Sequence, residues 1–227
     1  EGLVQSWKDI FPKKGEIHFA GALENNEDTG TLQYLASTAM EAGFSTRVLD
    51  MQALDLQNGR FFDPAGELVN RCFKLYPWEW MVDESPDGCL AEMEWLEPIW
   101  KLVMSNKAIL ATLYELFPDS PYVLPCYLSR PRSGLFCKKP VFSREGHNVS
   151  VVDIRDWEEY VRIAETEGDY NTGAYVYQEY VEPTAYSGRY PVIGSWIIGG
   201  EAAGIGIREN RMEVTDNLSE FVPHIIG

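Results

Sequence analysis

The sequence predicts two structural halves, an open α/β unit followed by a mainly antiparallel sheet with a helix. The first half is indicated by an apolar strand, a helical segment and a second strand that follow one another between residues 17 and 50. The second half is indicated by short β-type runs that begin at residue 122. The chain has 227 residues, of which 45% are hydrophobic and 13% aromatic, and this is enough to fill a core.

The α/β half shows strand and helix signals in a clear order. Strands are expected at Ile17–Gly21 and Thr46–Asp50, with a helix at Thr31–Ala42 that ends at Gly43. A short hairpin is expected across residues 60–70, because a Pro-Ala-Gly sequence there has the composition of a turn.

The segment after this hairpin is rich in aromatic residues and then in helical patterns. The aromatic side chains between Cys72 and Met81 are expected to pack inward. From Ala91 to Phe117 the apolar residues recur at helical intervals around Pro98. This predicts two or three helices, with Lys107 near the start of one of them.

The second half is expected to contain six strands and one helix. The β-type runs are residues 122–127, 135–141, 149–153, 175–181, 192–198 and 202–208. The helix is predicted at Asp156–Glu165, between the third and fourth runs. A boundary between Ser105 and Asp119 divides the chain into domains of residues 1–105 and 106–227.

Composition excludes some functional classes. The chain has 19 basic and 35 acidic residues and a net charge of -16, which opposes binding to a nucleic-acid backbone and could attract a polyamine. The four cysteines form no CxxC pair, and the three histidines have no spacing of a triad or a metal site. No apolar run has the length of a membrane span, so no membrane is expected as a partner and a cytoplasmic location is expected. Because of the negative net charge, no nucleic acid is expected as a partner either.

Two lysines and a polar loop have the chemistry of a phosphate site. Lys107 precedes a helical segment, and Lys139 ends a β-type run that leads into the loop at residues 143–148. A glycine-containing loop can close over a triphosphate while two lysines contact its oxygens. Each feature alone also fits a surface charge or a simple turn, and neither a P-loop nor a dinucleotide fingerprint occurs.

Two further segments follow in the order that a nucleotide site needs. The alternating run at residues 175–183 could present main-chain groups to the edge of an adenine ring, or could be a plain core strand. A hairpin with small residues follows and ends at Arg208, which could bind a transferring phosphoryl group or pair with Glu209 or Glu213.

Several segments together resemble the glutathionylspermidine synthase family, and closest are bacterial single-domain acid–amine ligases without an amidase domain. These segments are Phe73-Lys74-Leu75-Tyr76-Pro77-Trp78-Glu79-Trp80-Met81, Trp95-Leu96-Glu97-Pro98-Ile99-Trp100-Lys101, Ser105-Asn106-Lys107-Ala108, residues 139–150 and residues 204–209. The resemblance implies an ATP-grasp fold preceded by a pre-ATP-grasp unit. It also implies an acyl-phosphate mechanism that joins the glycine carboxylate of glutathione to a spermidine amine.

The resemblance assigns roles to individual residues. The nucleotide contacts that it implies are Lys107, Lys139, the loop residues Ser143, Arg144 and Gly146, and the adenine-strand residues Gln178, Glu179, Tyr180 and Val181. Arg208 takes the place of the catalytic arginine, and Arg211 is a weaker candidate.

The magnesium ligands of the family are not matched in this chain. The stretch at residues 23–28 imitates their Leu-Glu-Asn-Asn motif, but Thr31–Leu35 aligns with a later part of the family. The ligands for Mg²⁺ and for the acyl substrate are therefore expected upstream of Glu1, and the chain is expected to be the carboxy-terminal part of a longer protein.

The expected function is that of an ATP-dependent carboxylate–amine ligase acting on small molecules, a peptide-like acid and an amine or polyamine. A ligase of the same mechanism with another acid and amine is an open alternative. A second alternative, from another class, is a nucleotide-binding or regulatory scaffold without ligase activity.

Overall fold

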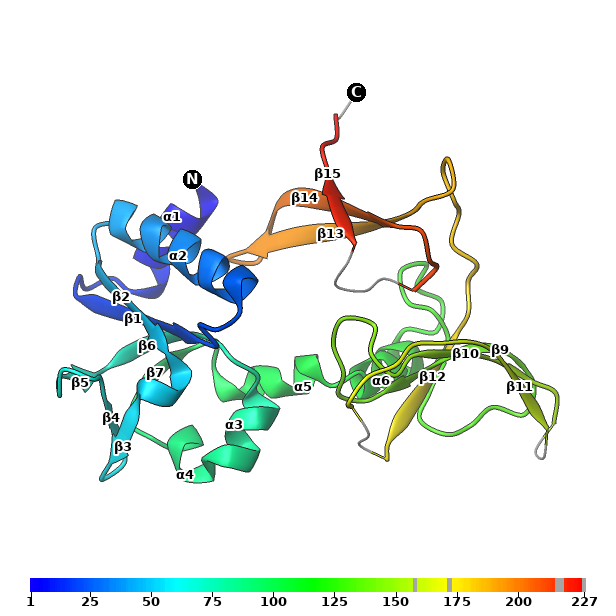
Figure 1. The fold of residues 1–227 in the computed structure, drawn as a ribbon, viewed down its shortest axis with the longest axis horizontal. Helices are drawn as coiled ribbons and strands as arrows, with labels where there is room; N and C mark the ends of the chain where they lie inside the picture. Colours follow the sequence, from blue (N-terminus) through cyan, green and yellow to red (C-terminus); the bar gives the residue numbers. More distant parts are fainter. Residues whose placement is uncertain (157–158, 171–172, 215–218, 226–227) are drawn as a thin grey trace. The chain divides into compact units, whose positions relative to one another are not determined.

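The structure is a computed structural model that describes residues 1–156, 159–170, 173–214 and 219–225. The chain forms two compact units (Figure 1). Unit 1 comprises Glu1–Leu102 and Ile197–Ala203, and unit 2 comprises Val103–Trp196 and Gly204–Gly227. No helix among the described residues is both long and apolar enough to cross a membrane.

Unit 1 is built on a parallel sheet with the strand order β2-β1-β6-β7. Its strands are β1 (Glu16–Gly21), β2 (Ser45–Asp50), β6 (Arg71–Leu75) and β7 (Glu94–Leu96). The two strands predicted at residues 17–21 and 46–50 are confirmed as β1 and β2. Strand β7 lies where helical spacing was expected, because Trp95 pairs with Cys72 and packs its ring 5.7 Å from that of Trp78.

Helices α1 (Gly2–Ile10) and α2 (Asn26–Glu41) cover one face of this sheet (Figure 1). Trp7 and Leu32 from these helices pack in one cluster with Phe19 of β1. Helix α2 begins before the predicted Thr31, because the Asn25 side chain caps it by accepting a hydrogen bond from the N–H of Glu27 at 2.9 Å.

The other face of the sheet is covered by short elements. These are η1 (Met51–Ala53), the hairpin strands β3 (Asp55–Gln57), β4 (Arg60–Phe62) and β5 (Leu68–Val69), and the helices α3 (Trp78–Glu84) and α4 (Pro86–Cys89). The hairpin predicted across residues 60–70 is confirmed as β4 and β5, and Gly66 turns with φ of 79°. Trp78 is buried, whereas Trp80 is 39% exposed, so the expectation that all these aromatic residues pack inward is wrong for Trp80.

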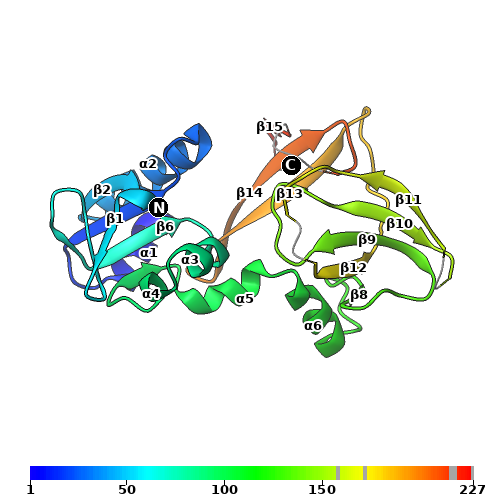
Figure 2. The same ribbon diagram turned by 60° about the horizontal axis from the view of Figure 1, so that its bottom comes forward.

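Unit 2 contains a five-stranded antiparallel sheet with the order β11-β10-β9-β12-β8 (Figure 2). The strands are β8 (Cys126–Tyr127), β9 (Gly134–Pro140), β10 (Ser150–Ile154), β11 (Tyr160–Glu165) and β12 (Tyr175–Glu179). The connection from unit 1 runs through η2 (Ile99–Lys101) and α5 (Leu102–Ser105) to α6 (Ala108–Leu116). Lys107 is the N-cap residue of α6, which confirms its predicted position near the start of a helix.

The helix predicted at residues 156–165 is wrong. Residues 157–158 lie outside the described residues, and residues 160–165 form strand β11. Asp156 Oδ1 accepts a hydrogen bond from the N–H of Glu159 at 2.8 Å, and β11 runs antiparallel to β10. An edge strand with charged residues exposed to solvent has a pattern that imitates an amphipathic helix.

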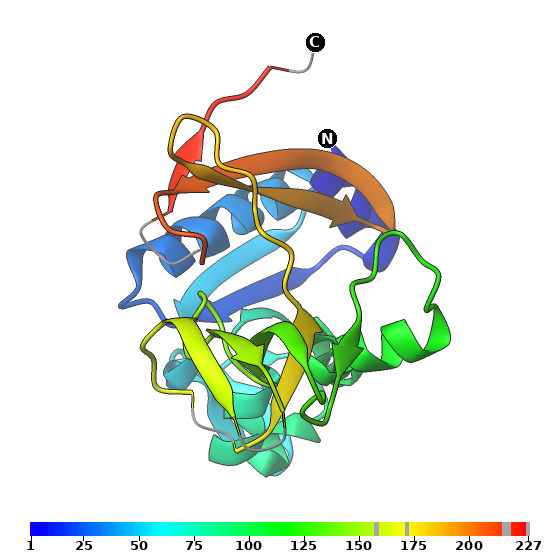
Figure 3. The ribbon, with the colours of Figure 1, turned by 90° about the vertical axis from the view of Figure 1, so that its right-hand side faces the viewer.

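A separate sheet of three strands, with the order β13-β14-β15, follows the five-stranded sheet in the sequence. Figure 3 shows the extended segment that leads from β12 (yellow) to β13 and β14 (orange). The strands are β13 (Tyr190–Ile198), β14 (Glu201–Asn210) and β15 (Glu220–Val222), and β15 had no clear signal in the sequence. Gly199 and Gly200, with φ of 60° and 87°, make the tight turn between β13 and β14.

His18 is buried in the sheet of unit 1 beside two carboxylates. Its Nε2 lies 3.8 Å from Glu16 Oε2 and 3.8 Å from Asp63 Oδ2. Arg47 binds the same carboxylates, with Nε 2.8 Å from Glu16 and Nη1 2.6 Å from Asp63. Burial lowers the pKa of His18 below its ordinary value of 6.5, although the two carboxylates act in the opposite direction.

The buried imidazole predicts a loss of stability in mild acid. The unfolded chain binds a proton at His18 near pH 6.5 and the folded chain only at a lower pH, so the free energy of unfolding should fall as the pH drops below about 6.5. Urea unfolding at about pH 7.5 and about pH 5.5 should show a smaller drop in His18→Gln than in the unmodified chain. The exposed His224 supplies the control, and equal pH dependence in His18→Gln and His224→Gln would contradict the prediction.

Candidate functional site

Unit 2 contains a cavity of about 410 Å³ on one face of its five-stranded sheet. Nine residues that the sequence singled out as nucleotide contacts line it: Lys107, Lys139, Ser143, Arg144, Gly146, Gln178, Glu179, Tyr180 and Val181. They come from the start of α6, from β9, from the loop after β9 and from β12 with its continuation. The cavity therefore brings together segments far apart in the sequence, while the role of each residue stays a prediction.

Strand alternation places the β9 and β12 residues on the cavity face. Cys137 and Lys139 are two positions apart, so both side chains point to the same side of β9. Gln178 on β12 lies opposite Cys137 in the sheet register. Lys139 Nζ donates a hydrogen bond to Gln178 Oε1 at 2.7 Å, and this contact holds the ammonium group at the cavity wall.

Lys107 reaches the same cavity from the start of α6. Its backbone N–H donates to the carbonyl oxygen of Val141 at 2.8 Å, which fixes the helix start against the end of β9. Its Nζ contacts the carbonyl oxygen of Ser143 at 2.5 Å and the Ser143 hydroxyl at 2.9 Å. Two ammonium groups therefore line one cavity, an arrangement that can bind the oxygens of an anionic ligand.

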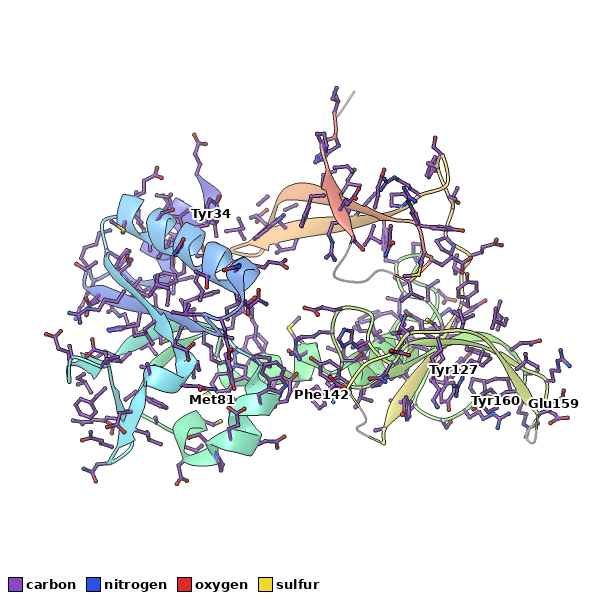
Figure 4. All side chains as sticks on the ribbon, in the orientation of Figure 1. Tyr34, Met81, Tyr127, Phe142, Glu159 and Tyr160 are labelled. Atoms are coloured by element: carbon purple, nitrogen blue, oxygen red, sulfur yellow. The ribbon has the colours of Figure 1, made fainter. Side chains whose placement is uncertain are left out.

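The loop at residues 143–148, which we call the lid, follows Phe142 (labelled in Figure 4). Three of its residues have left-handed backbone conformations, Glu145 with φ of 57°, Gly146 with φ of 73° and Asn148 with φ of 54°. Left-handed residues of this kind occur in anion-binding loops, although the N–H groups of His147 and Asn148 donate here to the carbonyl oxygens of Arg144 and Glu167.

The chain beyond β12 offers a main-chain donor to the cavity. The N–H of Glu179 donates to the carbonyl oxygen of Pro125 at 2.8 Å, and that of Tyr180 to the carbonyl oxygen of Leu135 at 3.0 Å. Among the residues that the structure describes, none accepts a hydrogen bond from the N–H of Val181. This N–H is therefore available to a hydrogen-bond acceptor on the edge of a planar ligand.

One wall of the cavity was not foreseen in the sequence. Glu213 and Val214, after β14, line the cavity, and the Tyr180 hydroxyl donates a hydrogen bond to Glu213 Oε2 at 2.5 Å. Burial, together with this bond, raises the pKa of Tyr180. No local signal marks this wall, whereas Cys137 and Val151 could have been found from the alternation of β9 and β10.

The two arginine candidates do not line this cavity. Arg208 lies on β14 opposite Phe221 of β15, with its guanidinium carbon 5.7 Å from the centre of the Phe221 ring. Glu209, a partner considered for Arg208, lies 3.9 Å from Arg189 instead. Arg211 follows β14 directly, and the catalytic role of either arginine stays a prediction.

The residues described here contain no group of three or more His, Cys, Asp and Glu placed to hold a metal ion. The imitation of a metal motif at residues 23–28 has structural functions: the N–H of Leu23 donates to Asp50 Oδ2 at 3.1 Å, and the Leu23 carbonyl oxygen accepts a hydrogen bond from the Thr29 hydroxyl at 3.0 Å. Asn25 caps α2. This stretch therefore connects β1 to α2.

Comparison with known proteins gives a consistent set of matches. The family model described as "Glutathionylspermidine synthase preATP-grasp" matches residues 1–227. The chain is 34% identical to a Haemophilus influenzae protein named "Putative acid--amine ligase", over 99% of this chain and 60% of that protein. It is 28% identical to trypanothione synthetase of Crithidia fasciculata, over 91% of this chain and 35% of that protein. It is 26% identical to the bifunctional glutathionylspermidine synthetase/amidase of Escherichia coli, over 100% of this chain and 41% of that protein.

Proposed function

The chain belongs to the glutathionylspermidine synthase preATP-grasp family, and from this premise we propose that it supplies the ATP-binding site of a ligase that joins a carboxylic acid to an amine. The observation that supports this most is the single cavity lined by Lys107, Lys139 and the lid. The chain spans 60% or less of the length of the three relatives named above, so the complete activity is proposed for the full-length protein.

The cavity fits ATP in its donor chemistry. Lys107 and Lys139 would contact phosphate oxygens, and the lid would cover the phosphates. Gln178–Val181 would lie along the adenine, with the N–H of Val181 donating to a ring nitrogen. In the structure, Ser143 accepts a hydrogen bond from the Lys107 ammonium group and Gln178 accepts one from the Lys139 ammonium group. The phosphates of ATP would compete with these two acceptors.

The proposed reaction has two steps. The substrate carboxylate attacks the terminal phosphorus of ATP, which forms an acyl phosphate and releases ADP. The amine then attacks the acyl carbon, and the carbon–oxygen bond to phosphate breaks, so that an amide and inorganic phosphate form. Cationic groups lower the barrier by stabilising negative charge on the phosphoryl group, and Arg208 is proposed for this role along with the two lysines. Magnesium would share this role, held by residues outside those described here.

Glutathione and spermidine, or a related acid and amine, are the proposed substrates. The relatives' names include glutathionylspermidine synthetase, and the net charge of -16 favours a cationic amine. A nucleotide-binding scaffold without ligase activity is the second candidate, favoured by the lack of a metal-holding group among the residues described.

Phosphate release by the full-length protein tests the proposal. With ATP and magnesium present, release should require both glutathione and spermidine, or both members of a related pair. Release that depends on the acid alone would indicate acyl-phosphate formation without transfer. ATP binding without release, for every acid and amine tried, would favour the scaffold instead.

ATP should reduce the mobility of the lid. The lid is polar, and phosphate contacts would add hydrogen bonds to those that Ser143 makes with Lys107. Amide hydrogen exchange across residues 143–148 should slow by about tenfold or more at saturating ATP. The buried strand β1, which belongs to unit 1 and contributes no residue to the cavity, serves as the internal control. Unchanged exchange in a chain shown to bind ATP would contradict the role of the lid.

A further inference from the structure

The lid rests on the segment that follows β11, residues 166–170, which we call the lid seat. Asn148 makes the central contact: its Nδ2 donates to the carbonyl oxygen of Gly168 at 2.8 Å, and its Oδ1 accepts from the N–H of Tyr170 at 2.8 Å. The rings of His147 and Tyr170 lie 5.9 Å apart. The end of the lid is therefore fixed by the seat as well as by β10.

Thr166 extends this attachment into the lid. Its hydroxyl donates to the carbonyl oxygen of Gly146 and accepts a hydrogen bond from the N–H of Val149 at 3.0 Å. Gly146 lines the cavity, whereas Thr166 and Gly168 do not. The seat therefore contacts the lid and contributes no residue to the lining of the cavity.

Gly168 makes the closest approach between the seat and the lid. A Cβ atom at this position would lie 2.4 Å from His147 Cβ and 2.9 Å from Asn148 Oδ1. Carbon atoms in contact are about 3.5 to 4.0 Å apart, so a side chain here would push the lid away. The φ of Gly168 is outside the left-handed region, so space, and not backbone conformation, requires the glycine.

We propose that Gly168 is a positioning residue for the ATP site, because its missing side chain lets the lid lie where Ser143 and Gly146 line the cavity. This inference rests on the proposed function. A displacement of the lid by about 1 Å would move its donors away from the phosphates, and errors of this size are costly in sites that depend on orientation.

Gly168→Ala in the 227-residue chain tests the inference by ATP titration calorimetry. The dissociation constant for ATP should rise about tenfold or more, and hydrogen exchange across residues 143–148 should accelerate. Gly30→Ala is the matched control, since a Cβ atom there would meet nothing within 4 Å, and it should leave both measurements unchanged.

Second-site variants separate positioning from loss of structure. Adding His147→Gly to Gly168→Ala removes the atom that clashes, so the ATP affinity should return to that of His147→Gly alone. Adding His147→Ala keeps the Cβ atom at 2.4 Å and should not rescue. Equal effects of the two second-site changes, or an ATP affinity that Gly168→Ala does not alter, would overturn the positioning role. Failure of the unmodified chain to bind ATP would instead overturn the proposed function.

Discussion

Lys139→Ala is expected to lower the rate of ATP-dependent phosphate release by the full-length protein by about 100-fold, with little change in stability. Lys139 is the cavity lysine that β9 presents beside Gln178, and its ammonium group would stabilise charge on the transferring phosphoryl group. Lys107→Ala should have an effect of similar size, because its ammonium group lines the same cavity. Steady-state kinetics and thermal unfolding of the same samples give the two measurements.

The neighbouring lysine is a matched control for Lys139. Lys138 points to the opposite face of β9, with its Nζ 4.0 Å from the centre of the Tyr175 ring. Lys138→Ala changes the net charge of the chain by the same amount as Lys139→Ala, but Lys138 does not line the cavity. Similar kinetics for Lys138→Ala and Lys139→Ala would show that net charge, and not the cavity contact, is responsible.

The 227-residue chain alone is expected to bind ATP without forming an amide. The cavity offers cations and main-chain donors, but the described residues offer no metal-holding group, and Mg²⁺ is usually held by carboxylates together with the substrate phosphates. With ATP, magnesium, glutathione and spermidine, phosphate release should stay at the level without enzyme. Calorimetric titration with ATP should still show binding.

The full-length protein at equal concentration is the positive control for this assay. Substrate-dependent turnover by the 227-residue chain would place the metal ligands within it. Glu24, Asn26 and Asp28 would then be the first positions to replace by alanine, despite the connecting role of this stretch between β1 and α2.

Local patterns predicted β1 and β2 of the unit 1 sheet but missed β6 and β7, whereas they predicted most strands of unit 2. Period-2 alternation predicted β9, β10 and β12 to within a few residues of their observed bounds. Nine residues selected from the motifs in and around these strands line one cavity. β11 was misread because an exposed edge strand has few buried positions, and the hydrogen bonds that join Arg155 and Asp156 to Glu159 have no signal in the sequence pattern.

Contacts distant in sequence were beyond these patterns. The bond from Tyr180 to Glu213 joins two polar residues with no local signature of pairing. The close approach of Gly168 to His147 was equally hidden, because a glycine in a loop between β-type runs has the composition of an ordinary turn. The roles of the nine cavity residues also needed the family resemblance, since lysines and turns alone favour no ligand.

The wall formed by Glu213 and Val214 has a consequence for synthesis of the protein. Both lysines, the lid and Gln178 leave the ribosome before β14 does, so a nascent chain has the phosphate contacts before the cavity is closed. A ligand that binds only the finished cavity stabilises completed chains and leaves nascent ones unaffected. If the proposed ATP binding requires this wall, ATP would stabilise completed chains more than chains interrupted before Glu213.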